Sequence, residues 1–268
     1  MDSLAWIYDF IMSLPCVQEV ALATAFWFFH QHIVMYSMRR LSATYAVLSK
    51  GDQLEVAISC CSITHAVISL NTIPVWLYNE ELAVEPMYGR MPEYYDRFLI
   101  FTVGYFMWDS LVSIYHGLGV PFCAHAVASL GVFWLGMHPF LQHYLGFFLG
   151  MFELSTPFYH TRNILGLLGN EKHIVYMIAT VCFSITFIVV RIGLGFYVSF
   201  TWWRLMYNLL QSGEAHSVAV VLYYMLCNIV IMTLQTIWLK EIVMGAVDLF
   251  SASKEVAFKE KHQAFKLD

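Results

Sequence analysis

Charged side chains are scarce in this chain. Asp, Glu, Lys and Arg make up 12% of its 268 residues, whereas an ordinary soluble domain carries about 25%. So few charges cannot cover a globular surface with well-solvated side chains. The hydrophobic fraction of 59% and the mean hydropathy of +0.63 point the same way. This composition excludes an ordinary soluble protein and predicts an integral membrane protein.

Two long stretches lack charge altogether. None of the four charged residue types occurs between Asp109 and Glu153, or within residues 215–239. A transmembrane helix needs about 20 apolar residues, so the first stretch is long enough for two crossings. A transmembrane β-barrel would instead show alternating segments of about ten residues. Because lipid requires every backbone polar group to be satisfied internally, these continuous runs predict an all-α integral membrane protein.

The chain also lacks the usual spacings of a metal or disulfide site. Its six cysteines form no CxxC pair, and no HExxH motif occurs, so we expect no zinc site and no disulfide framework. The net charge of −5 and the absence of a basic patch argue against a nucleic-acid partner. We therefore expect no cofactor and no metal, and membrane lipids as the partners.

The apolar runs predict about seven transmembrane helices in one membrane domain. A preceding segment and the first helix occupy residues 1–45, the membrane domain 46–250 and a charged tail 251–268. No basic n-region precedes the first run, so we expect that run to remain as a span. The predicted spans cover residues 15–38, 54–78, 97–117, 120–138, 141–160, 173–200 and 216–243.

The distribution of Lys and Arg predicts the orientation. Seven spans place ten basic residues on the C-terminal side of the membrane and three on the other. Since basic loops favour the cytosol, we expect a cytosolic C-terminus. The ten are Arg39, Arg40, Lys50, Arg162, Lys172, Lys240, Lys254, Lys259, Lys261 and Lys266, and the three are Arg90, Arg97 and Arg204.

Three charged residues lie deep inside predicted spans, namely Asp109, Glu153 and Arg191. A charge in the bilayer interior is costly unless it is paired or solvated, so each is a candidate functional residue. Arg162 lies nearer a helix end, where a long side chain can reach the interface. A buried ion pair that only sets helix register remains the alternative interpretation.

Histidines in apolar sequence supply the candidates for chemistry. His65 and Ser69 share one polar face of the second span, and His116 follows Asp109 by two helical turns. His125 begins the fourth span, with Ser129 one turn later. A carboxylate can orient a histidine as a general base, so Asp109, His116 and His125 are candidate catalytic residues. Hydrogen-bonded helix contacts are the plainer alternative for each histidine.

Pro157 lies inside the fifth predicted span. Proline removes a backbone hydrogen bond and kinks a helix, and the neighbouring Ser155 and Thr156 can satisfy the freed groups. A broken helix carrying Glu153 and these hydroxyls is a candidate wall of an internal cavity. Ordinary packing around a kink is the alternative.

Five segments occur in the order found in a known membrane family. They are Ser62–Ser69, Gly104–Asp109, Ala124–His125, Glu153–Phe158 and Phe187–Ile192. Together they resemble a TLC domain, the family named for translocating-chain-associating, longevity-assurance and ceroid-lipofuscinosis proteins. The resemblance covers residues 50–245 and is greatest to the small TLC-domain-containing proteins.

The resemblance implies a barrel-like bundle of six helices around a central lipid-accessible cavity, with one additional N-terminal helix. In this arrangement the cavity-lining residues would be His65, Ser69, Glu153, Ser155, Thr156, Pro157, Arg162 and Arg191. The endoplasmic reticulum is the expected location, with the plasma membrane as the alternative, and a homo-oligomer is left open.

The resemblance also implies a role in lipid metabolism. Ceramide synthases of the family carry a His-His pair and a His-Asp element, whereas this chain has Ala124-His125 and no His-Asp dipeptide. We therefore expect a protein of membrane lipid homeostasis that binds, senses or organises phospholipid or sphingolipid. The alternative is an acyltransferase with acyl-CoA as co-substrate, His125 as base or acyl acceptor, and Asp109 or Glu153 orienting it. A channel or transporter is a third option.

Overall fold

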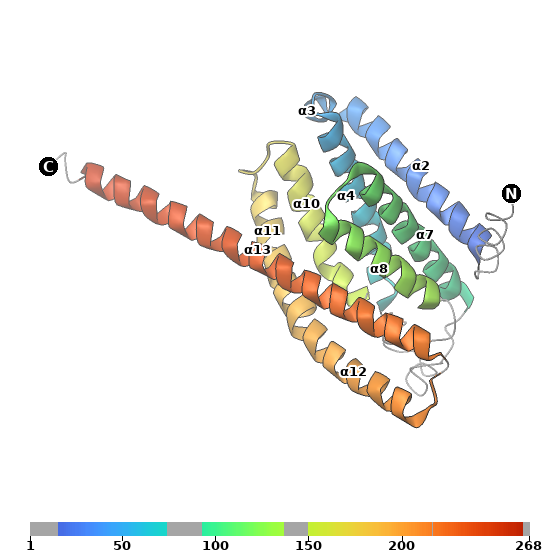
Figure 1. The fold of residues 1–268 in the computed structure, drawn as a ribbon. Helices are drawn as coiled ribbons and strands as arrows, with labels where there is room; N and C mark the ends of the chain where they lie inside the picture. The colour runs from blue at the N-terminus through green and yellow to red at the C-terminus, as the bar shows by residue number, and fades with distance from the viewer. Residues whose placement is uncertain (1–15, 74–92, 137–149, 216, 265–268) are drawn as a thin grey trace.

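The computed structural model describes residues 16–73, 93–136, 150–215 and 217–264, and all regular structure in these ranges is helical. The expected all-α fold is confirmed for these ranges. Figure 1 shows the helices running up and down beside one another, with the end of the last helix projecting from the bundle. In chain order the helices are α2 (Val17–Leu41), α3 (Ala43–Ala46), α4 (Lys50–Leu70), α7 (Glu93–His116), α8 (Val120–Gly136), η1 (Glu153–Ser155), α10 (Thr156–Leu167), α11 (Ile174–Thr186), η2 (Phe187–Leu194), α12 (Gly195–Ser212) and α13 (Val218–Ala264).

Four helical runs in the described part are long and apolar enough to cross a bilayer. They comprise Lys50–Leu70, Phe98–His116, Ile174–Ser212 and Val218–Val247, and α8 is a shorter apolar helix. The chain is therefore a multi-pass integral membrane protein. These runs coincide with the second, third, sixth and seventh predicted spans. Residues 74–78, 137–138 and 141–149 of the predicted spans lie outside the described residues.

The helix that corresponds to the sixth predicted span is much longer than that span. Residues 173–200 were expected to cross, whereas the continuous helix covers 39 residues, Ile174–Ser212. At 1.5 Å per residue this is about 60 Å, roughly twice the hydrocarbon thickness. The predicted end followed the fall in hydropathy near Arg204, but the helical backbone continues past that residue to Ser212. It ends at Gly213, whose φ of +73° gives the left-handed turn that favours glycine.

α7 and α8 form an antiparallel hairpin. Gly117 and Gly119 connect them with φ values of +62° and +103°, which side chains other than glycine rarely adopt. Because the connection is so short, the two helices pack along their lengths (Figure 1). This hairpin brings the polar residues of the third and fourth predicted spans together.

α2 covers the other side of α7. A Cβ on Gly104 would overlap Ala23, so the glycine lets the two backbones approach closely. Two fully buried indoles, Trp27 and Trp108, complete this interface. The Trp27 Nε1–H donates to the Phe101 carbonyl at 3.3 Å, and the Trp108 Nε1–H donates to Gln31 Oε1 at 2.9 Å. α7 thus lies at the centre of the bundle with both flanks covered.

Pro157 lies within a continuous helical stretch over residues 150–167, just after a local change of helix type. A 3₁₀ turn, Glu153–Ser155, precedes α10, and Pro157 lies in the first turn of α10. At a helix start the missing N–H of proline leaves no hydrogen bond unmade. The change of helix type therefore comes before the proline, at Glu153–Ser155.

Candidate functional site

His65 is the most enclosed histidine among the described residues, with 1% of its surface exposed. Its Nδ1 lies 3.7 Å from Glu153 Oε1, and its Nε2 lies 3.4 Å from both Thr102 Oγ1 and Ser69 Oγ. The ring stacks on Tyr105, with centroids 3.9 Å apart and planes 4° apart. α4, α7 and η1 therefore fix this imidazole together, which permits little rotation of its ring.

A short aromatic bridge connects His65 to His125. Phe106 contacts the His65 ring edge-on at 5.5 Å and the His125 ring edge-on at 6.1 Å. The preceding Tyr105 donates its hydroxyl to Ser62 Oγ at 2.9 Å, which holds this part of α7 against α4. The two histidines thus lie on either side of one phenylalanine ring.

Arg191 lies in η2, a π-helical segment within the run Ile174–Ser212. Its Nε donates to the Phe152 carbonyl at 3.1 Å and to Ser155 Oγ at 2.8 Å, and its Nη2 donates to Thr156 Oγ1 at 3.0 Å. The Cζ atom also lies 5.7 Å from the centroid of Phe152 and 5.6 Å from that of Phe187, within reach of a cation–π interaction. π-Helical turns often occur at functional sites.

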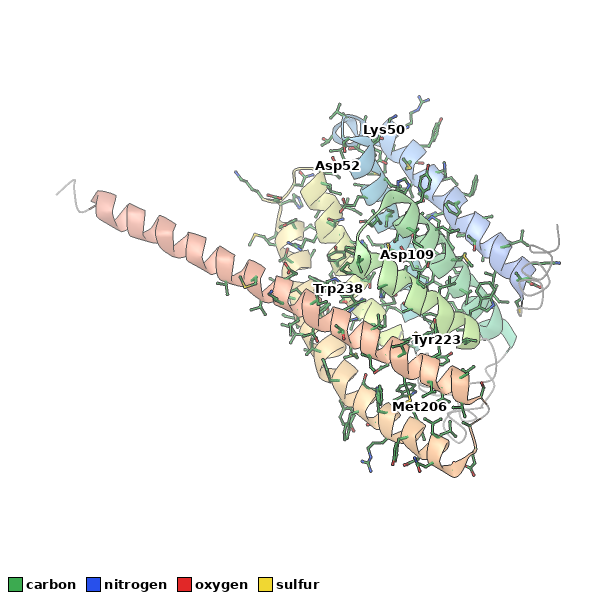
Figure 2. All side chains as sticks on the ribbon, in the orientation of Figure 1. Lys50, Asp52, Asp109, Met206, Tyr223 and Trp238 are labelled. Atoms are coloured by element: carbon green, nitrogen blue, oxygen red, sulfur yellow. The ribbon has the colours of Figure 1, made fainter. Side chains whose placement is uncertain are left out.

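The charge of Arg191 acts on several groups around it. Electrostatic interactions couple it to Glu153, His125 and His160. Asp109 is half-buried on α7 (Figure 2), accepts a hydrogen bond from the Ser113 side chain and interacts electrostatically with Glu153. One guanidinium and two carboxylates therefore share the interior of the bundle with the histidines.

The carboxylate–histidine pair differs from the predicted one. Among the described side chains, the pair is His65–Glu153, whereas the sequence suggested Asp109 or Glu153 beside His125, with Asp109 too far from His116 for direct contact. His116 is exposed at the end of α7, with its ring beside Tyr115 at 4.8 Å. Seven residues separate Asp109 and His116 along the helix, about 10 Å of rise, and no bend brings them together.

Two of the predicted residues have other surroundings. Arg162, on α10, has its Cζ 5.8 Å from the ring of Tyr176 on α11. His125 contacts Trp238 of α13 edge-on at 5.8 Å, and its Nδ1 is buried without a hydrogen-bond partner. Ser69, Glu153, Ser155 and Thr156 do meet, through His65 and Arg191, as residues of one polar cluster.

Sequence reasoning missed several side chains of this interior. Thr102 and Tyr105 contact His65, and they look like ordinary residues of an apolar helix. Gln235 carried a usable signal, because it is a strongly polar residue within the uncharged stretch 215–239. In the described part of the chain, no three His, Cys, Asp or Glu side chains converge as a metal site would require.

Comparison with known proteins relates the chain to one family. A model described as the TLC domain matches residues 55–244. An uncharacterised TLC domain-containing protein of Schizosaccharomyces pombe is 26% identical over 238 residues, covering 87% of this chain and 80% of that protein. TLC domain-containing protein 4-B of Xenopus laevis is 27% identical over 164 residues, covering 58% and 60% respectively. Topoisomerase I damage affected protein 4 of Saccharomyces cerevisiae is 29% identical over 175 residues, 61% of each chain.

Proposed function

Because this chain belongs to the TLC-domain family, we propose that it acts in membrane lipid homeostasis by binding a phospholipid or sphingolipid inside its helical bundle. The observation that carries this proposal is the position of Arg191. Its guanidinium is held in the interior by three hydrogen bonds to uncharged acceptors. Burying a charge in a membrane protein is expensive and usually serves a function.

The arrangement of positive and negative charges around Arg191 supports a polar lipid headgroup as the ligand. A guanidinium binds phosphate or other anionic oxygens well, and Glu153 and Asp109 offer oxygens to a cationic or hydroxyl-bearing part of the same headgroup. The acyl chains would leave between helices toward the surrounding lipid. His65, Ser69, Ser155, Thr156 and Pro157 would then line the polar end of the site.

The proposal includes a membrane arrangement. Seven spans, six of them in a barrel-like bundle around a lipid-accessible cavity, would place the headgroup site within the bilayer. The excess of basic residues on the C-terminal side supports a cytosolic C-terminus. The endoplasmic reticulum is the proposed membrane, with the plasma membrane as the alternative and homo-oligomerisation left open.

The test compares lipid binding by two arginine variants. The full chain and the variants Arg191→Gln and Arg204→Gln are purified in mild detergent, and bound lipid is measured by native mass spectrometry. Arg204 is an exposed residue of α12 and serves as the matched control. We expect wild type and Arg204→Gln to retain lipid, and Arg191→Gln to lose about tenfold or more in affinity. Lipid-free wild type, together with unchanged cellular lipids when the gene is deleted, would refute the proposal.

An acyl-CoA-dependent N- or O-acyltransferase is the second candidate, and the His65–Glu153 pair favours it. A carboxylate beside an imidazole can orient it to remove a proton from a lipid hydroxyl or amine. The freed oxygen or nitrogen would attack the thioester carbonyl of acyl-CoA. The C–S bond would then break, and the departing thiolate of CoA would take the proton.

Acyl transfer is tested by separate His65→Ala and His125→Ala variants. Wild type is incubated with acyl-CoA and membrane lipids, and both acylated lipid and acylated protein are measured by mass spectrometry. If His65 is the base, His65→Ala abolishes product without an acyl adduct accumulating on wild type. If His125 accepts the acyl group, a covalent acyl mass appears and disappears in His125→Ala. If wild type gives neither acylated lipid nor acylated protein, the acyltransferase candidate is ruled out. No observation specifically favours a channel or transporter.

A further inference from the structure

Among the described residues, six side chains have buried polar atoms without a hydrogen-bond partner, and four of the six lie on α7, α8 and α13. Gln235 is fully buried and both its Nε2 and its Oε1 are unpaired, and the same is true of Ser110 Oγ, Ser129 Oγ and His125 Nδ1. Buried polar groups in folded proteins are nearly always hydrogen-bonded. Leaving one unpaired costs about 1–3 kcal/mol, so a cluster of them needs an explanation.

The hairpin of α7 and α8 brings three of these residues together. Ser110 lies eight residues before Leu118 in the connection and His125 lies seven after it, so they stand at the same height on two antiparallel helices. Phe106, one turn before Ser110, contacts the His125 ring. Ser129 lies one turn beyond His125 on the same face of α8.

α13 presents Gln235 to the same place. Tyr224 donates its hydroxyl to the Val132 carbonyl of α8 at 2.7 Å, and Trp238 contacts His125 at 5.8 Å. Gln235 follows Tyr224 by eleven residues, which is three helical turns, so the two share a face. Figure 2 labels Trp238 on α13 where it crosses α8. Gln235 therefore lies between two contacts to α8 and faces Ser129 and His125.

The chemistry of this cluster differs from that around Arg191. Two serine hydroxyls and the Gln235 amide carry no charge, and the amide offers one acceptor and two donor hydrogens. Esters and phosphate diesters only accept hydrogen bonds, so they leave Oε1 unsatisfied. A hydroxyl or a secondary amide both donates and accepts. His125 connects the cluster to the charged groups, because it interacts electrostatically with Arg191.

We propose that Gln235, Ser110 and Ser129 form, beside His125, an uncharged site for the hydroxyl or secondary amide of a bound lipid. The inference rests on the proposed lipid-binding function and names the chemical group that the protein selects. Such a lipid would supply hydrogen-bond partners to buried atoms that have none within the protein. A site built to hydrogen-bond a hydroxyl discriminates strongly against an analogue that lacks it.

The test uses ligand pairs that differ by a single donor hydrogen. The first pair is a diacylglycerol and its methyl ether, and the second is a long-chain secondary amide and its N-methyl derivative. Binding to the full chain in lipid nanodiscs is measured by native mass spectrometry, with phosphatidylcholine as a probe that only accepts hydrogen bonds. Gln235→Met is the test variant because methionine has a similar length, and Gln211→Met, at an exposed position of α12, is the control.

Wild type and Gln211→Met should bind the donor member of at least one pair about tenfold or more tightly than its methylated partner. Gln235→Met should lose that preference while still binding phosphatidylcholine. The pair that shows the preference identifies the group as a hydroxyl or an amide. Thermal unfolding of lipid-free protein tests folding, and Gln235→Met should unfold no earlier than wild type because it removes two unpaired polar atoms.

Two other outcomes would overturn the inference. Equal donor preference in wild type and Gln235→Met would mean that the unpaired atoms bind internal water. A lower unfolding temperature of Gln235→Met with unchanged lipid preference would give Gln235 a structural role. In both cases lipid binding itself persists, so the proposed function stands. If wild type binds none of the five probes, the proposed function fails as well.

Discussion

The polar side chains on the two sides of the bundle interior differ in charge and in whether they have hydrogen-bond partners. On the side of α4, η1 and η2, the charged Arg191 and Glu153 are surrounded by partners, and His65 is fixed from three directions. On the side of α8 and α13, the polar groups are uncharged, and several lack partners. On the first side most polar groups have hydrogen-bond partners within the protein, although His65 Nδ1 has none, whereas on the second side Gln235, Ser110 and Ser129 lack partners. The two sides thus differ in how much of their buried polarity is paired within the protein.

Among substitutions on the side of α4, η1 and η2, loss of Arg191 should lower the free energy of unfolding the most. Arg191→Leu removes the donor to the Ser155 and Thr156 hydroxyls and one of the donors to the Phe152 carbonyl, and it leaves the charge of Glu153 uncompensated. We expect the free energy of unfolding in detergent to fall by about 3–5 kcal/mol. Arg204→Leu, at an exposed position of α12, should change it by about 0.5 kcal/mol at most. Equal effects of the two variants would contradict the structural account.

The His65–Glu153 contact should show direct coupling. His65→Gln and Glu153→Gln should each destabilise the protein by about 1–3 kcal/mol, because each substitution leaves the other side chain of the pair without this contact. The double variant should be less destabilised than the sum by about 1 kcal/mol. The measurement is a double-mutant cycle of denaturant unfolding in detergent. Additive effects would mean that the two groups do not interact.

Two buried serines offer the smallest and most direct comparison. Ser155 has 1% of its surface exposed and accepts a hydrogen bond from Arg191, whereas Ser129 has 2% exposed and its Oγ is unpaired. Ser155→Ala should cost about 1.5–3 kcal/mol of unfolding free energy, since it removes a charge-assisted bond. Ser129→Ala should be neutral within about 0.5 kcal/mol. Unfolding curves that rank the two in the reverse order would break the distinction between the two sides.

Local chemistry made several site residues predictable. Asp109, Glu153 and Arg191 stand out because charges are rare in membrane spans, and all three are at least half-buried in the structure, which agrees with that reasoning. Ser155 and Thr156 were expected to satisfy backbone groups freed by Pro157. In the structure Ser155 does donate to the backbone carbonyl of Phe152, and both hydroxyls also accept hydrogen bonds from Arg191, a residue more than 30 positions away. A proline predicts a local break in a helix, but it does not indicate which distant side chain will donate hydrogen bonds to the residues at that break.

The histidine chemistry was predicted less well, for a geometric reason. Helical periodicity placed Asp109 and His116 on one face of α7 but about 10 Å apart, so the sequence suggested His125 as the partner of Asp109 or Glu153. The observed partner of His65 is Glu153, and the contact depends on how α4 packs against η1. Periodicity gives the direction of a side chain about its own helix axis but does not give the identity of the neighbouring helix.

The sequence alone determined that this protein is helical and lies in a membrane, because scarce charge and long apolar runs allow no other solvent and no other backbone structure. It also marked the charged residues that had to be buried together. Only the tertiary structure decided which of them meet, that Arg191 binds beside the η1 turn, and that the Gln235 amide is buried without a hydrogen-bond partner. Those contacts depend on helix packing, where side chains from distant segments compete for the same few partners, and sequence spacing does not record that competition.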